Sequence, residues 1–243
     1  LADIGILTSA VIVVRIIRYI PQILTPIYVT TYSRIHANSS ELLQYSKAFS
    51  VDVFLVSMFC IGSALLIYIW APIIVPVLWG ENFGRLTVII MRIELIGVIG
   101  LAYSVQTPNF LIVMGQPKYN LRLAVAHIAL QSILSVILLL FMGIIGVAVA
   151  TSLTMIIMAG VRHRIIEDQL GVKIHIRPII QLVTIFGLSV AVYYVMAWSK
   201  MLSLLGVALI VSPISIGLLL FVLVSNRSAL RFLKIAVNEN ILG

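Results

Sequence analysis

The sequence is poor in cysteine and in charge, and each shortage excludes a class of protein. Only one cysteine, Cys60, occurs in 243 residues, so the chain cannot contain an internal disulfide framework. Charged residues make up 10% of the chain and apolar residues 62%. Because a soluble domain is only about half apolar, this composition indicates an integral membrane protein.

Patterns typical of catalysis and metal binding are also missing. The sequence has no P-loop, no Cys/His spacing of a metal site and no Ser/His/Asp arrangement. Its basic residues are scattered over short loops without an aromatic platform, so nucleic acid is not an expected partner. We therefore predict no enzymatic activity, no cofactor and no metal site.

Long apolar runs dominate the sequence. Seven of them approach the roughly 20 residues that an α-helix needs to cross about 30 Å of hydrocarbon. The strands of a membrane β-barrel alternate in polarity and are about half as long. The predicted fold class is all-α, a polytopic bundle of seven transmembrane helices. The expected spans are residues 8–29, 50–70, 87–106, 120–141, 144–161, 179–197 and 202–224.

The loops divide the chain into four predicted parts. Residues 1–161 would form a bundle of five helices, and residues 162–177 a basic loop. Residues 178–225 would add two helices, and residues 226–243 an amphipathic tail at the membrane surface. Since the chain starts at Leu1 without a signal-peptide pattern, we expect it to be part of a longer protein.

The second span has polar and helix-breaking residues near its ends. Asp52 lies close to the first end, where we expect a solvated carboxylate. Pro72 and Pro76 lie near the second end, before Trp79, and are expected to stop the helix at the membrane surface.

Basic residues predict the orientation of the bundle. Eleven of the 16 lysines and arginines lie on one side of the predicted spans, and only Arg85 and Lys200 lie on the other. The positive-inside rule therefore places the first side, and with it the C-terminus, in the cytoplasm. The eleven residues are Arg34, Lys47, Lys118, Arg122, Arg162, Arg164, Lys173, Arg177, Arg227, Arg231 and Lys234.

Two arginines lie in the interior of the first span. Arg15, Arg18 and Gln22 follow a spacing of three and four residues, so they share one face of a helix. A charged side chain at the bilayer centre costs about 3 kcal/mol on insertion scales. We therefore expect this face to line protein or a water-filled path rather than lipid.

Further polar residues in the third and fourth spans are candidates for the same path. Arg92 is expected to line it or else to form a structural ion pair, and Glu94 to be a pairing or coupling carboxylate. Gln131 shares one helix face with His127, which is a candidate proton-coupling group or part of a hydrogen-bonded seam between helices. The sequence alone leaves both alternatives open for Arg92, Glu94 and His127.

The order of these features resembles a known family. The arginine-bearing span is followed by one that closes in Trp79-Gly80-Glu81-Asn82-Phe83, then by GQPKYN at 115–120, then by the small-residue segment from Gly143 to Thr151. This order is similar to the C-terminal half of prokaryotic polysaccharide flippases, which belong to the multidrug/oligosaccharidyl-lipid/polysaccharide exporter superfamily. In members with fourteen helices, the seven spans would correspond to the eighth through the fourteenth.

The resemblance implies a function. Such a flippase translocates a polyprenyl-diphosphate-linked oligosaccharide across the prokaryotic cytoplasmic membrane for surface polysaccharide biosynthesis, by alternating access around a cationic cavity. Membrane lipids and an N-terminal lobe of the same protein would be its other partners. The alternatives are a small-molecule or drug cation antiporter of the same superfamily, or a polytopic membrane enzyme of polysaccharide assembly. The substrate-binding residues implied for the flippase are Arg15, Arg18, Gln22, Arg92 and Gln131.

Overall fold

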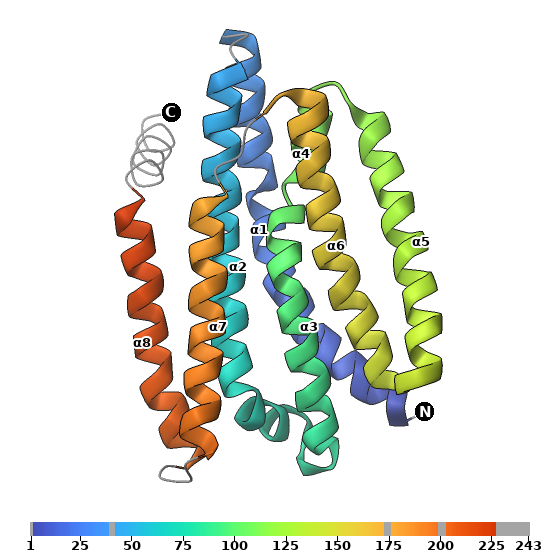
Figure 1. The fold of residues 1–243 in the computed structure, drawn as a ribbon, viewed down its shortest axis with the longest axis vertical. Coiled ribbons are helices and arrows are strands. Elements are labelled where there is room, and N and C mark those ends of the chain that lie inside the picture. The colour runs from blue at the N-terminus through green and yellow to red at the C-terminus, as the bar shows by residue number, and fades with distance from the viewer. Residues whose placement is uncertain (1, 39–41, 173–175, 199–202, 227–243) are drawn as a thin grey trace.

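The computed structural model describes residues 2–38, 42–172, 176–198 and 203–226 (Figure 1). All regular secondary structure across these residues is helical, which confirms the all-α prediction. Seven helical segments there are long and apolar enough to cross a membrane, as predicted. The elements are α1 (Ala2–Asn38), α2 (Leu42–Trp79), the 3₁₀ turn η1 (Glu81–Phe83), α3 (Gly84–Ser104), α4 (Thr107–Val113), α5 (Pro117–Met142), α6 (Ile144–Leu170), α7 (Arg177–Trp198) and α8 (Leu204–Ser225).

Helix α3 lies at the centre of the bundle. It packs against α1, α2 and α6, while α5 packs on α6, and the α7–α8 pair packs on α2. The main core between these helices contains fully buried apolar side chains such as Ile61, Leu65, Ile90 and Leu95. In Figure 1 the α2–α3 and α5–α6 connections lie at the lower end and the α4–α5 connection at the upper end. We call these two ends of the bundle the lower end and the upper end.

Two glycines allow α3 to approach α6 closely. A Cβ atom at Gly100 would lie 2.5 Å from the carbonyl of Met155, and one at Gly97 would lie 2.7 Å from the Cα of Ser152. Since close-packed interiors leave no room for such overlaps, a larger residue would push the helices apart. The Ser152 hydroxyl also donates to the carbonyl of Ile93 (2.7 Å) across this contact. Helices α3 and α6 are therefore in close contact along their middle.

Helix α2 corrects one expectation, because it continues through Pro72 and Pro76 to Trp79 instead of stopping at the prolines. Proline has no N–H, so Pro72 leaves the carbonyl of Tyr68 without its helical partner. The Nε of Arg92, on α3, donates to that carbonyl at 3.3 Å. This contact satisfies a buried acceptor and lets the helix continue past the proline.

Asp52 corrects a second expectation, because its carboxylate is fully buried rather than solvated. Helices α1 and α2 pack together near this residue, and the Tyr32 hydroxyl donates to Asp52 Oδ2 at 2.5 Å. A buried carboxylate needs such donors, since water cannot reach it.

The end of α6 corrects a third expectation. The helix continues to Leu170, so the first half of the basic loop predicted for residues 162–177 is helical. The helix ends at Gly171, whose left-handed conformation (φ 65°) favours glycine. Arg162 is thereby placed on α6, two turns before its end. The amphipathic tail predicted for residues 226–243 lies, after its first residue, outside the described part of the chain.

Candidate functional site

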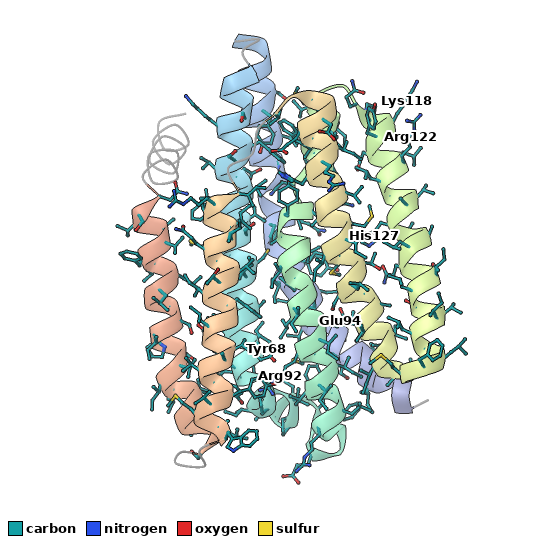
Figure 2. The ribbon with its side chains drawn as sticks, in the orientation of Figure 1. Tyr68, Arg92, Glu94, Lys118, Arg122 and His127 are labelled. Atoms are coloured by element: carbon teal, nitrogen blue, oxygen red, sulfur yellow. The ribbon has the colours of Figure 1, made fainter. Side chains whose placement is uncertain are left out.

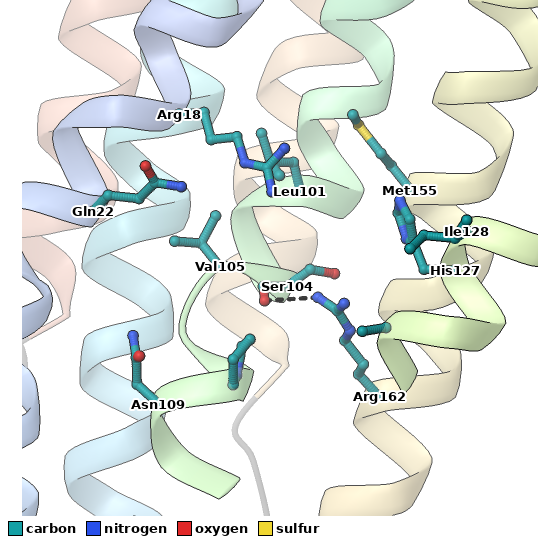
Figure 3. Close-up of a pocket in the computed structure, with 12 residues that line it drawn as sticks. Arg18, Gln22, Leu101, Ser104, Val105, Asn109, His127, Ile128, Met155 and Arg162 are labelled. Carbon is teal, nitrogen blue, oxygen red and sulfur yellow. Dashed lines mark hydrogen bonds between the residues drawn. The ribbon is translucent and has the colours of Figure 1, made fainter. Parts of the chain in front are cut away.

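Two adjoining cavities with both polar and apolar lining lie between α1, α3, α5 and α6, and Pro108 and Asn109 of α4 also line the larger one. Their volumes are about 390 Å³ and about 280 Å³. Helix α1 packs on α3, and α5 packs on α6, so the cavities occupy the space between α1 and α5. Figure 3 shows the larger one with side chains from all these helices around it. The two cavities share the lining residues Arg18, Leu101, His127 and Met155.

The polar face predicted on α1 lines both cavities. Arg18 lies at their junction, Gln22 lines the larger cavity and Arg15 lines the smaller one. The three side chains keep the common helix face that their spacing predicts. All three side chains are exposed in the described structure, so the expectation that this face avoids lipid stays a prediction.

The smaller cavity also contains the predicted carboxylate and amide. Glu94 of α3 is 2% exposed and lies beside Thr151 of α6. Gln131 of α5 donates from Nε2 to Oγ1 of Thr151 (3.4 Å), and the Thr151 hydroxyl donates to the carbonyl of Val147 (3.0 Å). The structure thus brings residues from α3, α5 and α6 together opposite the arginines of α1.

Arg162 is a lining residue that the sequence analysis placed in a loop. It lines the larger cavity from α6, and its Nη1 donates to the carbonyl of Ser104 at 2.8 Å (Figure 3). Ser104 ends α3, and Pro108, four residues later, has no N–H to offer to that carbonyl. Arg162 therefore supplies the missing donor at the break between α3 and α4. Gly171 was the available signal, since a helix that ends there includes residue 162.

The charges of the larger cavity are unbalanced. Arg18 and Arg162 line it from opposite walls, and no carboxylate is among its lining residues. The two guanidinium groups are close enough to interact electrostatically with each other and with His127. Within the described part of the chain, neither arginine has a carboxylate within 4.0 Å. This arrangement favours an anion, which would relieve the repulsion between the two cations.

Arg92 is the one predicted site residue that lies apart from both cavities (Figure 2). It sits near the lower end, where its guanidinium contacts the rings of Tyr68, Tyr193 and Tyr194. The other predicted residues line the cavities, namely Arg15, Arg18, Gln22, Glu94, His127 and Gln131. Sequence periodicity could not distinguish Arg92 from the residues that line the cavities. It predicts which residues share a face of one helix, but not which other helix packs against that face.

Comparisons with known proteins add no family assignment. No family model matches this chain, and no curated protein matches it. Among the residues that the structure describes, no group of three or more His, Cys, Asp or Glu side chains is placed to hold a metal ion. The chemistry of the site therefore has to be argued from its arginines and the polar groups around them.

Proposed function

We propose that this chain is part of a membrane transporter that flips a polyprenyl-diphosphate-linked oligosaccharide by alternating access, and that the diphosphate binds in the larger cavity. The observation that carries the proposal is the pair Arg18 and Arg162, two guanidinium groups on one cavity without a carboxylate among its lining residues. An anionic substrate class follows directly from this charge, whereas a cation would be repelled.

Arginine is suited to such a substrate. Its planar guanidinium offers parallel N–H groups that match two oxygens of one phosphate. A diphosphate carries two such groups, so Arg18 could hold one phosphate and Arg162 the other. Gln22 and Gln131, from neighbouring walls, offer uncharged donors and acceptors to the attached sugar.

The lipid portion of the substrate would stay in the bilayer beside the bundle. Many apolar side chains of α8 are exposed, for example Leu209, Ile214 and Phe221, as hydrocarbon contact requires. Helix α5 also exposes most of its side chains, with Leu123 its buried residue. We propose that α5 faces the N-terminal lobe of the same protein, and that the chain lies in the cytoplasmic membrane with its upper end in the cytoplasm.

Transport of a defined substrate tests the proposal. The complete protein would be reconstituted in liposomes with a fluorescent polyprenyl-diphosphate oligosaccharide. Wild type would be compared with the double variant Arg18→Gln/Arg162→Gln. Each lost charge-assisted contact is worth about 1.5–3 kcal/mol, so together the changes should slow transport by about 100-fold or more. Arg122→Gln and Arg164→Gln, which remove exposed arginines outside the cavity lining, should leave transport unchanged. Normal transport by the folded double variant would rule the proposal out.

The antiporter alternative has one observation in its favour. Glu94 is a buried carboxylate on the smaller cavity, and export of a cationic drug would need such a group. Arg15 and Arg18 line the same cavity, however, so a bound cation would meet two positive charges. Uptake of a fluorescent cationic dye, compared between wild type and Glu94→Gln, separates the two functions. Dye export that depends on Glu94 would favour the antiporter.

A further inference from the structure

The guanidinium group of Arg92 is enclosed by aromatic rings rather than by carboxylates. Its Cζ lies 4.9 Å from the ring centroid of Tyr68, 5.1 Å from that of Tyr193 and 5.6 Å from that of Tyr194. Within the described residues, no carboxylate lies within 4.0 Å of it. Cation–π contacts stabilise a guanidinium but leave its net charge in place.

Arg92 keeps two N–H donors that the protein does not use in the contacts described. Its Nε donates to the Tyr68 carbonyl (3.3 Å), Nη1 to the Tyr194 hydroxyl (3.3 Å) and Nη2 to the Tyr193 hydroxyl (3.0 Å). A guanidinium has five N–H donors, two on each terminal nitrogen. One N–H therefore remains on Nη1 and one on Nη2, and such groups form charge-assisted hydrogen bonds with phosphate oxygens.

The surface around Arg92 is apolar and exposed. Ile89 and Ile96 lie three residues before and four residues after it, on the same face of α3, and are 46% and 40% exposed. Tyr194, on α7, is 48% exposed. Figure 2 shows Arg92 between α3 and α7, with α2 and its Tyr68 behind them. Since exposed isoleucines on a spanning helix face hydrocarbon, the open side of Arg92 faces lipid.

The depth of this site matches the headgroup region. Tyr194 lies four residues before Trp198, where α7 ends, so about 6 Å of helix separates them. Tyrosine and tryptophan at a helix end typically mark the level of the headgroups. Arg92 lies about 12 Å from the start of α3, and its long side chain can extend towards that level.

We infer that Arg92 and its three tyrosines form a binding site for the headgroup phosphate of a membrane phospholipid in the leaflet at the lower end. The phosphate accepts the two remaining N–H donors and neutralises the charge, while the acyl chains lie along Ile89 and Ile96. The site is separate from the cavities, so a test of the lipid site and a test of the flippase proposal are independent of each other.

Lipid titration monitored by native mass spectrometry tests this site. The purified protein would be titrated with phosphatidylglycerol and with diacylglycerol, which has the same chains but no phosphate. We expect wild type to prefer phosphatidylglycerol by tenfold or more, since one charge-assisted contact alone provides about tenfold, and Arg92→Gln to lose this preference. Arg85→Gln, which removes an exposed arginine at the start of the same helix, should retain it. Equal preference in folded Arg92→Gln and wild type would overturn the inference.

A second measurement needs no variant at Arg92. Phosphatidylglycerol with a photoreactive headgroup would be cross-linked to the wild-type protein, and the labelled peptides would be identified. We expect label at Tyr193, Tyr194 or Val195, beside the guanidinium. Label confined to helices other than α2, α3 and α7 would show that the phosphate does not bind at Arg92, even if Arg92→Gln does not fold.

Discussion

Arg92, between α2, α3 and α7, and Arg162, between α3 and α6, make the same kind of backbone contact in two regions of the bundle. Each donates to a carbonyl that a proline four residues later leaves without its helical partner, Tyr68 in one case and Ser104 in the other. The regions differ in what surrounds the rest of the guanidinium. Arg92 has three tyrosine rings around it, whereas Arg162 has a cavity on which Arg18 also lies.

This difference shows why a charge inside a membrane span is not evidence of one particular role. The backbone contact gives both arginines a structural reason to be there, because an unsatisfied buried carbonyl is costly. What distinguishes them is their surroundings, three tyrosine rings at Arg92 and a cavity shared with Arg18 at Arg162. Because Arg92 makes three hydrogen bonds and Arg162 makes one, we expect changes at Arg92 to affect stability more than changes at Arg162.

The largest effect is expected from separating α3 and α6. Gly100→Leu would place side-chain atoms inside the backbone of Met155, so the helices must move apart and the contact between Arg162 and Ser104 must break. Because the overlap is with backbone atoms, this overpacking should exceed the usual range and cost about 4 kcal/mol, which should appear as a lower unfolding midpoint in a denaturing-detergent titration. Gly160→Leu on α6 is the control, since a Cβ there meets no atom within 4 Å. Equal loss in both variants would contradict the close α3–α6 contact.

The next largest effect compares the two arginines directly. Arg92→Met removes three hydrogen bonds and three ring contacts and should lower the free energy of unfolding by about 3 kcal/mol. Arg162→Met removes one hydrogen bond, and water in the cavity can hydrate Ser104, so we expect a loss of only about 1 kcal/mol. The same detergent titration measures both. Should Arg162→Met prove the more destabilising, the larger contribution to stability expected of Arg92 would be wrong.

The helical framework and much of the cavity lining were predictable from sequence because both depend on local rules. Length and apolarity predict the spans, and the 3.6-residue period places Arg15, Arg18 and Gln22 on one face. The cost of burying charge in lipid then predicts that this face is lined by polar groups. These arguments need no knowledge of neighbouring helices, and the structure agrees with the predicted spans and with that common face.

Other features depend on which helices are neighbours, and the sequence alone does not contain that information. The position of Arg92 beside Tyr193 and Tyr194 follows from α7 packing on α2, a contact between distant segments. The continuation of α2 through Pro72 depends on a donor from another helix, so a local rule for proline predicted the wrong end. Arg162 was misplaced for a local reason, because its basic surroundings resembled a loop.

The smallest effect tests the backbone contact itself. Pro108→Ala restores an N–H that can donate to the Ser104 carbonyl, so Arg162 should no longer be needed there. In a double-mutant cycle on the free energy of unfolding, Arg162→Gln should then cost about 1 kcal/mol less in the Pro108→Ala background than in wild type. Pro72→Ala, which restores the corresponding donor near Arg92, should leave the cost of Arg162→Gln unchanged. A coupling equal for both prolines would mean that Arg162 does not substitute for the missing proline N–H.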